Sequence, residues 1–241
     1  MCGIIGAHNT GLRTRLLSHR GQDAKQTIEH GQTKFTHYLH AINDHVEQPF
    51  ESDSHVVLTN CEIYNADELS EQGRNDAEQF YHYLIDQGVS KATLEMVDGV
   101  HSTAIYDKAD KTITLCRDKY GVKPLWYAHT EDGFAFASER KALTGFDDKA
   151  IRELHPRHIL TYDTTTNEVR TAYRGFHKRK DTKDHDDYDE LVQTTATRIQ
   201  DAVLKRVPDD APLGLLFSGG LDSATIAHIL NEHGVDFTAY Y

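Results

Sequence analysis

The sequence is poor in cysteine and contains no long apolar run. Three cysteines in a chain of 241 residues are too few, and odd in number, for a disulfide framework, and this indicates a reducing compartment. No apolar stretch approaches the roughly 18 residues that a membrane-spanning helix needs. The first residues also lack the basic and long apolar regions of a signal peptide. We therefore expect a globular protein of the cytoplasm.

Basic residues are also in short supply. The 26 lysines and arginines are outnumbered by 38 acidic residues, which gives a formal net charge of -12. Such a charge repels nucleic acid and anionic membranes, and no basic stripe stands out against it. The 16 histidines have no cysteine or carboxylate cluster at ligand spacing, so we expect no metal site. Neither nucleic acid nor a membrane is expected as a partner.

Short strand-like runs separated by turn residues fill the first two thirds of the chain. Residues 102–116 form two alternating runs around a turn, and 125–138 repeat this pattern around an Asp-Gly pair, so two hairpins are predicted. Residues 75–88 instead have helical spacing, with Asn75 as N-cap and Gly88 as the stop. Strands interrupted by helices indicate an α+β domain.

The pattern changes after about residue 176. The segment "HKRKDTKDHDDYDE" has no apolar period and is typical of a linker. An amphipathic helix is predicted over 191–207, followed by the apolar run "LGLLF", a loop and a second helix. These elements cannot cover both faces of a parallel sheet, so we expect an incomplete α/β domain. The expected division is a first domain over 1–176, a linker over 177–190 and an incomplete domain over 191–241.

A glycine-rich loop lies between the last predicted strand and helix. In "SGGLDS" at 218–223, the unpaired N–H groups of a helix start and the helix dipole converge on an anion, and glycines let a phosphate approach the backbone. The dinucleotide-binding and lysine-containing phosphate-loop fingerprints are absent. The spacing alone is compatible both with a phosphate-binding loop and with a glycine-rich turn that has no ligand.

Cys2 directly follows the initiator methionine. A cysteine there is small enough for an aminopeptidase to expose it. The new α-amine, with a pKa of roughly 7.7 to 8.0, can accept the thiol proton near neutral pH. An N-terminal nucleophile thus carries its own base. Taken alone this feature is a weak signal, because many proteins begin Met-Cys, and Cys2 is then a small residue near a terminus.

Several stretches carry a family resemblance. Six of them occur in the order found in class II glutamine amidotransferases: "MCGIIG" at 1–6, "HRGQD" at 19–23, "NCEIYN" at 60–65, "NDAE" at 75–78, "RDKYGVKPLWY" at 117–127 and "FASERKAL" at 136–143. The loop "SGGLDS" is similar to the pyrophosphate-binding loop of ATP pyrophosphatases of the asparagine synthetase type. Together these stretches make essentially the whole chain resemble glutamine-hydrolysing asparagine synthetases.

The resemblance implies a fold and an activity. The fold is that of N-terminal-nucleophile hydrolases, a four-layer αββα sandwich of the α+β class, followed by the start of an α/β ATP-pyrophosphatase domain. The activity is that of a carbon–nitrogen ligase of asparagine biosynthesis. Its substrates are glutamine, aspartate and ATP with Mg²⁺, and it has no tightly bound cofactor. Only 241 − 222 = 19 residues follow Asp222, so this chain alone is expected to be a glutaminase. A homodimer is left open.

The resemblance also assigns roles to individual residues. Cys2 attacks the side-chain amide of glutamine, and the Asn60 side chain with the backbone N–H of Cys61 holds the oxyanion. Asp76 holds the substrate α-ammonium, and Arg20 supports the site. The other residues of the glutamine pocket are Glu62, Leu39 and His40. The loop against ATP comprises Phe217, Ser218, Gly219, Gly220, Leu221, Asp222 and Ser223, with Asp222 near the magnesium pyrophosphate.

Two departures from the family pattern bear on the site. Cys61 stands where the family commonly has glycine; if that backbone needs a positive φ, cysteine adds roughly 1 to 2 kcal/mol of strain. Leu39 stands where the family usually has an arginine that pairs with the substrate α-carboxylate. Losing that charged hydrogen bond costs about 10- to 150-fold in affinity, so weak glutamine binding is expected, with His40 as a partial substitute.

Two alternatives to asparagine synthesis follow from the same residues. One keeps both domains but amidates another carboxylate. The other is a non-catalytic glutamine or nucleotide sensor on the same fold, an alternative that the two departures favour and that retention of Cys2, Asn60 and Asp76 opposes.

Overall fold

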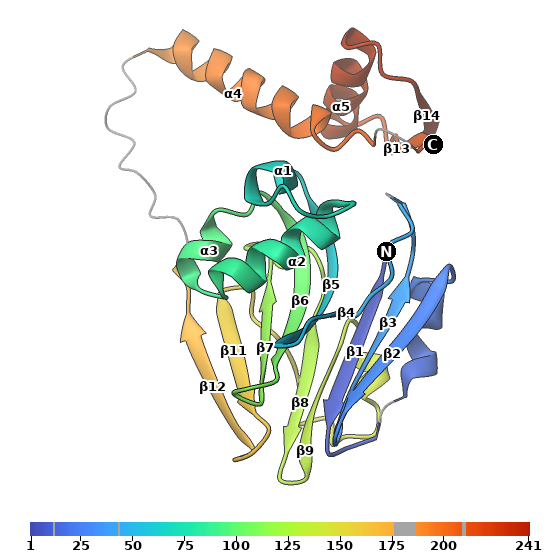
Figure 1. The fold of residues 1–241 in the computed structure, drawn as a ribbon. Helices are drawn as coiled ribbons and strands as arrows, with labels where there is room; N and C mark the ends of the chain where they lie inside the picture. The colour runs from blue at the N-terminus through green and yellow to red at the C-terminus, as the bar shows by residue number, and fades with distance from the viewer. Residues whose placement is uncertain (12, 43, 176–186, 209–210) are drawn as a thin grey trace. The chain divides into compact units, whose positions relative to one another are not determined.

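The computed structural model describes residues 1–11, 13–42, 44–175, 187–208 and 211–241. The chain forms two compact units, Met1–Phe176 and His177–Tyr241, and Figure 1 traces both. Most of the predicted linker, residues 177–186, lies outside the described residues.

The first unit contains two six-stranded antiparallel sheets that face each other (Figure 1). The β1 sheet has the order β10-β8-β9-β1-β3-β2 and comprises Ile151–Glu153, Trp126–Thr130, Gly133–Ala137, Gly3–His8, Thr33–Leu39 and Ala24–His30. The β5 sheet has the order β12-β11-β7-β6-β5-β4 and comprises Glu168–Tyr173, His158–Asp163, Thr112–Arg117, Gly99–Asp107, His55–Ile63 and Phe50–Glu51. Both predicted hairpins are confirmed, as β6–β7 and β8–β9.

The apolar core between the two sheets consists of their inward-facing residues. Ile4 and Phe35 from the β1 sheet and Leu58 from the β5 sheet belong to one buried cluster. Side chains alternate between the two faces of a strand. Cys2, two residues before Ile4, and Asn60, two residues after Leu58, therefore continue the inner rows of their sheets beyond the apolar core.

Helices cover the outer faces of both sheets. On the β5 sheet, α2 (Asp76–Gln87) buries Phe80 and Leu84, with the short helices α1 (Ala66–Leu69) and α3 (Lys91–Glu95) beside it. The predicted helix caps are confirmed, because Asn75 Oδ1 accepts from Glu78 N at 3.0 Å and Gly88 ends the helix with φ 69°. The β1 sheet is covered by two 3₁₀ helices, η1 (Thr14–Arg20) and η2 (Arg140–Leu143). The four-layer αββα plan is thus confirmed, with one thin outer layer.

The β8–β9 turn shows why one glycine is needed. Gly133 opens β9 with φ 156°, and a Cβ there would lie 2.3 Å from the carbonyl oxygen of His8. Only glycine tolerates both the backbone angle and this close approach. The turn therefore fixes β9 beside β1, the strand that follows Cys2.

The second unit begins with α4 (Tyr188–Leu204), followed by β13 (Leu213–Leu216), α5 (Leu221–Glu232) and β14 (Phe237–Tyr240). The strands β13 and β14 are parallel, as predicted for an α/β unit, and α5 connects them. None of the described helices in the chain is long and apolar enough to cross a bilayer.

Three predicted features of the second unit are wrong in detail. The linker prediction of 177–190 extends too far, because the Asp187 side chain caps the N–H groups of the next turn and α4 starts at Tyr188. The helix predicted over 191–207 ends at Leu204, since the next turn tightens to i→i+3 bonds before Pro208. The strand predicted to be buried has Leu216 83% exposed, because no described element covers that side chain.

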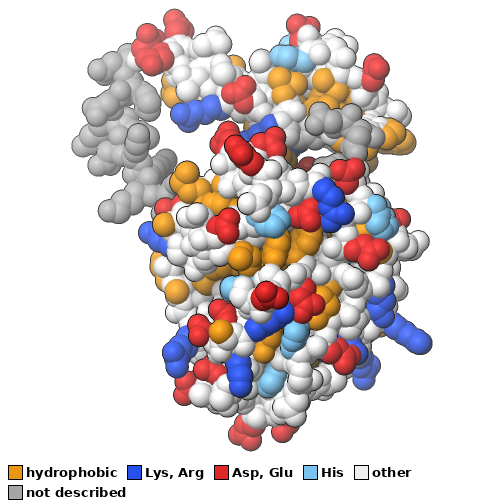
Figure 2. Space-filling view, viewed as in Figure 1, with side chains coloured by type: hydrophobic (Ala, Val, Ile, Leu, Met, Phe, Trp, Pro, Cys, Tyr) orange, Lys and Arg blue, Asp and Glu red, His pale blue; other side chains and the backbone are white. Residues whose placement is uncertain are grey.

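The surface carries charges of both signs. Figure 2 shows acidic and basic side chains interspersed over the described residues of the visible face. No continuous basic stripe appears on that face, in keeping with the net charge of -12.

Candidate active site

Two hydrogen bonds hold Cys2 just before β1, one to its carbonyl oxygen and one to its thiol. Arg20, the last residue of η1, donates from Nε to the Cys2 carbonyl oxygen at 3.0 Å and from Nη1 to Glu139 at 2.8 Å. The backbone N–H of His40, just after β3, donates to Cys2 Sγ at 3.5 Å. Because β1 and β3 are paired in the sheet, these contacts fix the thiol at the end of both strands.

Burial sets the protonation of the thiol and of the neighbouring amine. It raises the pKa of Cys2, against the opposing effects of the His40 hydrogen bond and of the α-amine. Burial also lowers the pKa of the N-terminal amine, here that of Met1, below its ordinary value of 8.0. Burial thus favours the neutral form both of the thiol and of the amine at this end of the chain.

The edge of β5 next to Asn60 is open. The strand β4 pairs only with Val56 and Val57 of β5. Beyond these two residues, two N–H groups of β5 that point away from β6 donate to side-chain oxygens. Thr59 N donates to Gln48 Oε1 at 2.8 Å, and Ile63 N donates to Asp76 Oδ2 at 2.9 Å. Alternate N–H groups of a strand point the same way. The N–H of Cys61 therefore lies between these two, on the same edge.

Two donors at adjacent positions are left without a protein partner. No hydrogen bond from the Cys61 N–H is formed within the described residues. The neighbouring Asn60 side chain is 2% exposed, and its Nδ2 has no partner in the described part of the chain. A buried amide is normally hydrogen-bonded, so this pair of free donors is well suited to a negatively charged oxygen.

The two sheets bring these groups to one place. Burial is the main cause of the raised pKa of Cys61. The charges of Asp76 and Cys2 raise this pKa further. Burial likewise raises the pKa of Asp76, against hydrogen bonds from the N–H groups of Ile63 and Ala77, with Glu62 adding to the increase. The predicted residues Cys2, Asn60, Cys61, Glu62 and Asp76 are thus gathered around one site.

Leu39 and His40 provide no free cation here. Leu39 is buried and ends β3. The His40 imidazole is largely exposed, with Nδ1 3.6 Å from Asp23 Oδ2. His40 contributes to the site through its backbone instead.

The strain considered for Cys61 does not arise. Such strain requires a positive φ at Cys61. The described non-glycine residues with positive φ are instead Asn9, Asp44, Lys111 and Asn167. Cys61 lies inside β5 in extended backbone, which any residue adopts.

Sequence reasoning overlooked two residues in stretches it had matched. Burial alone would raise the pKa of Glu139, but hydrogen bonds from Lys141, Arg20 and His19 outweigh it and lower the pKa to about 2. Glu139 therefore anchors Arg20, which holds Cys2. The second residue, Lys123, is 8% exposed. Lysine is rarely buried, but that burial is visible only in the fold.

The predicted phosphate loop joins β13 to α5. Gly219 has φ 75°, Gly220 is the N-cap of α5, and the described residues provide no side-chain cap there. Ser218 Oγ and Ser223 Oγ lie 3.2 Å apart across the loop. Asp222 is exposed in the first turn. The N–H groups at the start of α5 are therefore available to an anion.

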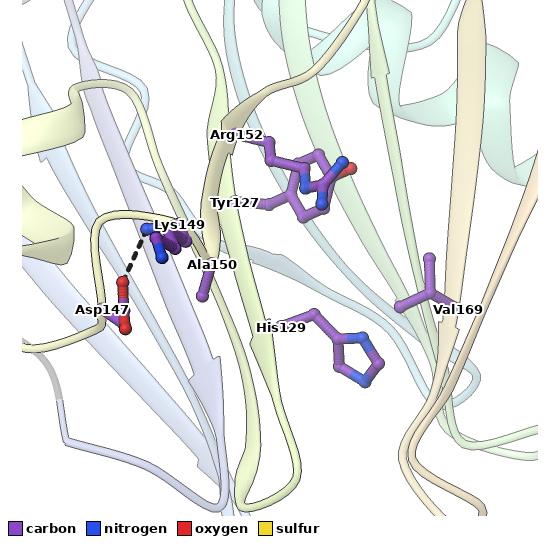
Figure 3. Close-up of a pocket in the computed structure, with 7 residues that line it drawn as sticks. All are labelled: Tyr127, His129, Asp147, Lys149, Ala150, Arg152 and Val169. Atoms are coloured by element: carbon purple, nitrogen blue, oxygen red, sulfur yellow. Dashed lines mark hydrogen bonds between the residues drawn. The ribbon is translucent and has the colours of Figure 1, made fainter.

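A cavity elsewhere in the first unit is not part of this site. It has a volume of about 430 Å³ and lies between the edges of the two sheets, lined by Tyr127, His129, Asp147, Lys149, Ala150, Arg152 and Val169 (Figure 3). None of these is a candidate site residue. Within the described ranges no group of three or more histidine, cysteine or acidic side chains is placed to hold a metal ion.

Comparison with protein families gives two matches. The model for the glutamine amidotransferase domain matches residues 1–185, and the model for asparagine synthase matches residues 194–240. The first match spans the whole sandwich with its candidate site, and the second spans the phosphate loop.

The chain is similar to curated asparagine synthetases. Asparagine synthetase [glutamine-hydrolyzing] 2 of Bacillus subtilis is 29% identical over 96% of this chain and 39% of its own length. The enzyme of Asparagus officinalis is 33% identical over 91% of this chain and 38% of its own length. The chain thus spans roughly two fifths of these relatives.

A solved structure shares the fold. Glutamine phosphoribosylpyrophosphate amidotransferase from B. subtilis superimposes with a TM-score of 0.60 at 15% identity, over 99% of this chain and 65% of that one. At this identity the likeness concerns the fold alone.

Proposed function

The chain belongs to the glutamine amidotransferase domain family, and from this we propose that it hydrolyses glutamine at Cys2 to supply ammonia for asparagine synthesis. The first unit is the glutaminase, and the second is the beginning of the ATP-dependent synthetase part. Glutamine, aspartate and ATP with Mg²⁺ are the proposed substrates, and the cytoplasm is the proposed compartment on the grounds of cysteine content.

The proposed reaction begins after Met1 is removed. The freed α-amine of Cys2 takes the thiol proton, and the sulfur attacks the side-chain carbonyl carbon of glutamine. The carbonyl oxygen becomes an oxyanion, stabilised by Asn60 Nδ2 and the Cys61 N–H. The C–N bond breaks, the α-ammonium returns the proton to the leaving nitrogen, and ammonia departs. Water then hydrolyses the thioester to glutamate and regenerates the thiol.

The second unit supports the other half of the proposal. The N–H groups at the start of α5 and the glycines before them suit a pyrophosphate, and the match to the asparagine synthase model covers this loop. With a complete synthetase domain, ATP would adenylate aspartate with release of pyrophosphate, and ammonia would displace AMP to give asparagine.

One observation carries the proposal: two unpaired donors, the Asn60 side-chain amide and the Cys61 N–H, next to the half-buried thiol of Cys2. The Asn60 donor does not stabilise the protein on its own, because a buried unsatisfied donor is costly. A ligand oxygen that accumulates negative charge explains both donors.

The test combines intact mass with glutamate release. With a diazoketone analogue of glutamine, we expect the processed chain to lack Met1 and to gain one adduct on Cys2. We expect glutamate release from glutamine to be abolished in Cys2→Ala. The control Cys61→Gly keeps the backbone N–H and should still be labelled at Cys2. A processed wild-type chain that binds glutamine but neither reacts nor releases glutamate would be a sensor instead.

A further inference from the structure

The main chain of Lys123 is fixed on both sides by buried side chains. Asp118 Oδ2 accepts from Lys123 N at 3.0 Å, and Arg117 Nε donates to the Lys123 carbonyl oxygen at 2.7 Å. Asp118 Oδ1 accepts from Val122 N at 2.9 Å, so the loop after β7 is wound around one carboxylate. The position of Lys123 is therefore set by the fold, before any ligand binds.

Lys123 is a largely buried residue, and its ammonium has no anionic partner among the described residues. The residue is 8% exposed, and no hydrogen bond or ion pair of its Nζ is formed within the described residues. By contrast, Lys108 pairs with Glu51 at 2.7 Å and Lys141 with Glu139 at 2.8 Å. The Nζ of Lys123 is not among the buried polar atoms without a partner, so this unpaired ammonium keeps some contact with solvent and is open to a ligand. An anionic ligand would supply the missing partner.

The loop that holds Lys123 begins at the end of the sheet where Asn60 lies. Arg117, at the end of β7, is paired with Ser102 of β6, which is paired with Asn60 of β5. The positive charge of Lys123 also opposes the increases, due mainly to burial, in the pKa values of Cys2 and Asp76. Lys123 thus acts on groups from both sheets of the site.

Neither of the other basic side chains near the thiol is free. Arg20 is engaged with the Cys2 carbonyl and Glu139, and the His40 imidazole lies near Asp23. Leu39, where the family usually has an arginine, is apolar. We infer that the Lys123 ammonium binds the α-carboxylate of glutamine in place of that arginine. This inference rests on the proposed glutaminase activity. Lys123 and Asp76 would then hold the two charges of the amino acid.

The test compares glutamine with its α-carboxamide, in which the α-carboxylate is neutral. In the wild-type chain we expect kcat/KM to be about 10- to 150-fold higher for glutamine, the effect of one charged hydrogen bond. In Lys123→Met this preference should fall to near one, through a higher KM for glutamine. Lys123→Arg keeps the charge and should keep part of the preference.

Controls separate this role from others. Lys149→Met, on an exposed lysine outside the site, should behave as wild type. If Lys123→Met does not fold, Lys123→Gln gives the same comparison. An unchanged preference in a folded variant overturns the inference, and so does an equal loss for both substrates, which would mean that Lys123 acts on the thiol. A wild-type chain that neither releases glutamate nor is labelled at Cys2 refutes the proposed function, and this inference with it.

Discussion

Among single residues, Asn60 is the one where function and stability are expected to conflict. Its buried Nδ2 has no partner in the described protein, so its amide does not contribute a hydrogen bond to folding. Removal of one oxyanion donor typically lowers the rate about 10²- to 10³-fold. We predict that Asn60→Ala loses this much in kcat while its free energy of unfolding stays the same or increases. Glutamate release and denaturant unfolding measure the two effects.

Gln48 provides the matched control. Its Oε1 accepts from Thr59 N, one position before Asn60 on the same strand. Gln48→Ala leaves a buried N–H unpaired, which costs roughly 1 to 3 kcal/mol, and should change kcat little. If Asn60→Ala instead kept wild-type kcat, the assignment of its amide to the oxyanion would be wrong.

Some site residues were predictable from sequence and others were not. Cys2 was predicted by its position behind Met1, and Asn60 and Asp76 by short motifs, but their roles remain proposals. Lys123 was not singled out, because its burial depends on the hydrogen bonds that Asp118 and Arg117 form with its main chain. Neither interaction leaves a periodic signal in the sequence.

At the level of elements, Asp76 joins the start of α2 to the edge of β5. Its Oδ2 accepts from Ile63 N at 2.9 Å, and its charge is proposed to hold the substrate α-ammonium. We predict that Asp76→Asn keeps the acceptor and hence the stability, but raises KM for glutamine about 10- to 150-fold through loss of the charge.

Asp76→Ala tests whether the two roles are separable. It also leaves the Ile63 N–H unpaired, so it should raise KM similarly and destabilise the protein by a further 1 to 3 kcal/mol or so. KM from glutamate release and unfolding in denaturant give the comparison. Equal KM values for wild type and Asp76→Asn would exclude the charge from substrate binding.

The elements that were predicted well are those with strong local signals. The hairpins had alternating runs and turn residues, and α2 had Asn75 and Gly88 at its ends. The 3₁₀ helices η1 and η2 were not predicted, because their short segments are held by burial of Leu17 and Leu143 against the β1 sheet. The start of α4 was misplaced since the Asp187 cap lies among linker-like charges.

For the whole first unit, two buried histidines determine how stability depends on pH. Burial lowers the pKa of His37 to about 3 and that of His101 to about 3, for His101 against the opposing charge of Asp118. Both values lie below the ordinary 6.5 that the unfolded chain recovers. Between pH 6.5 and 3 the unfolded state therefore binds more protons, so stability falls as the pH decreases.

We predict that this unit loses up to about 1.4 kcal/mol per pH unit for each of the two histidines below pH 6.5. Trp126, the single tryptophan, lies in β8, so its fluorescence reports denaturant unfolding of this unit alone. Between pH 7 and 5, His37→Gln and His101→Gln should each reduce the pH dependence, and the exposed control His45→Gln should not. A pH dependence that both variants leave intact would assign acid unfolding to the carboxylates.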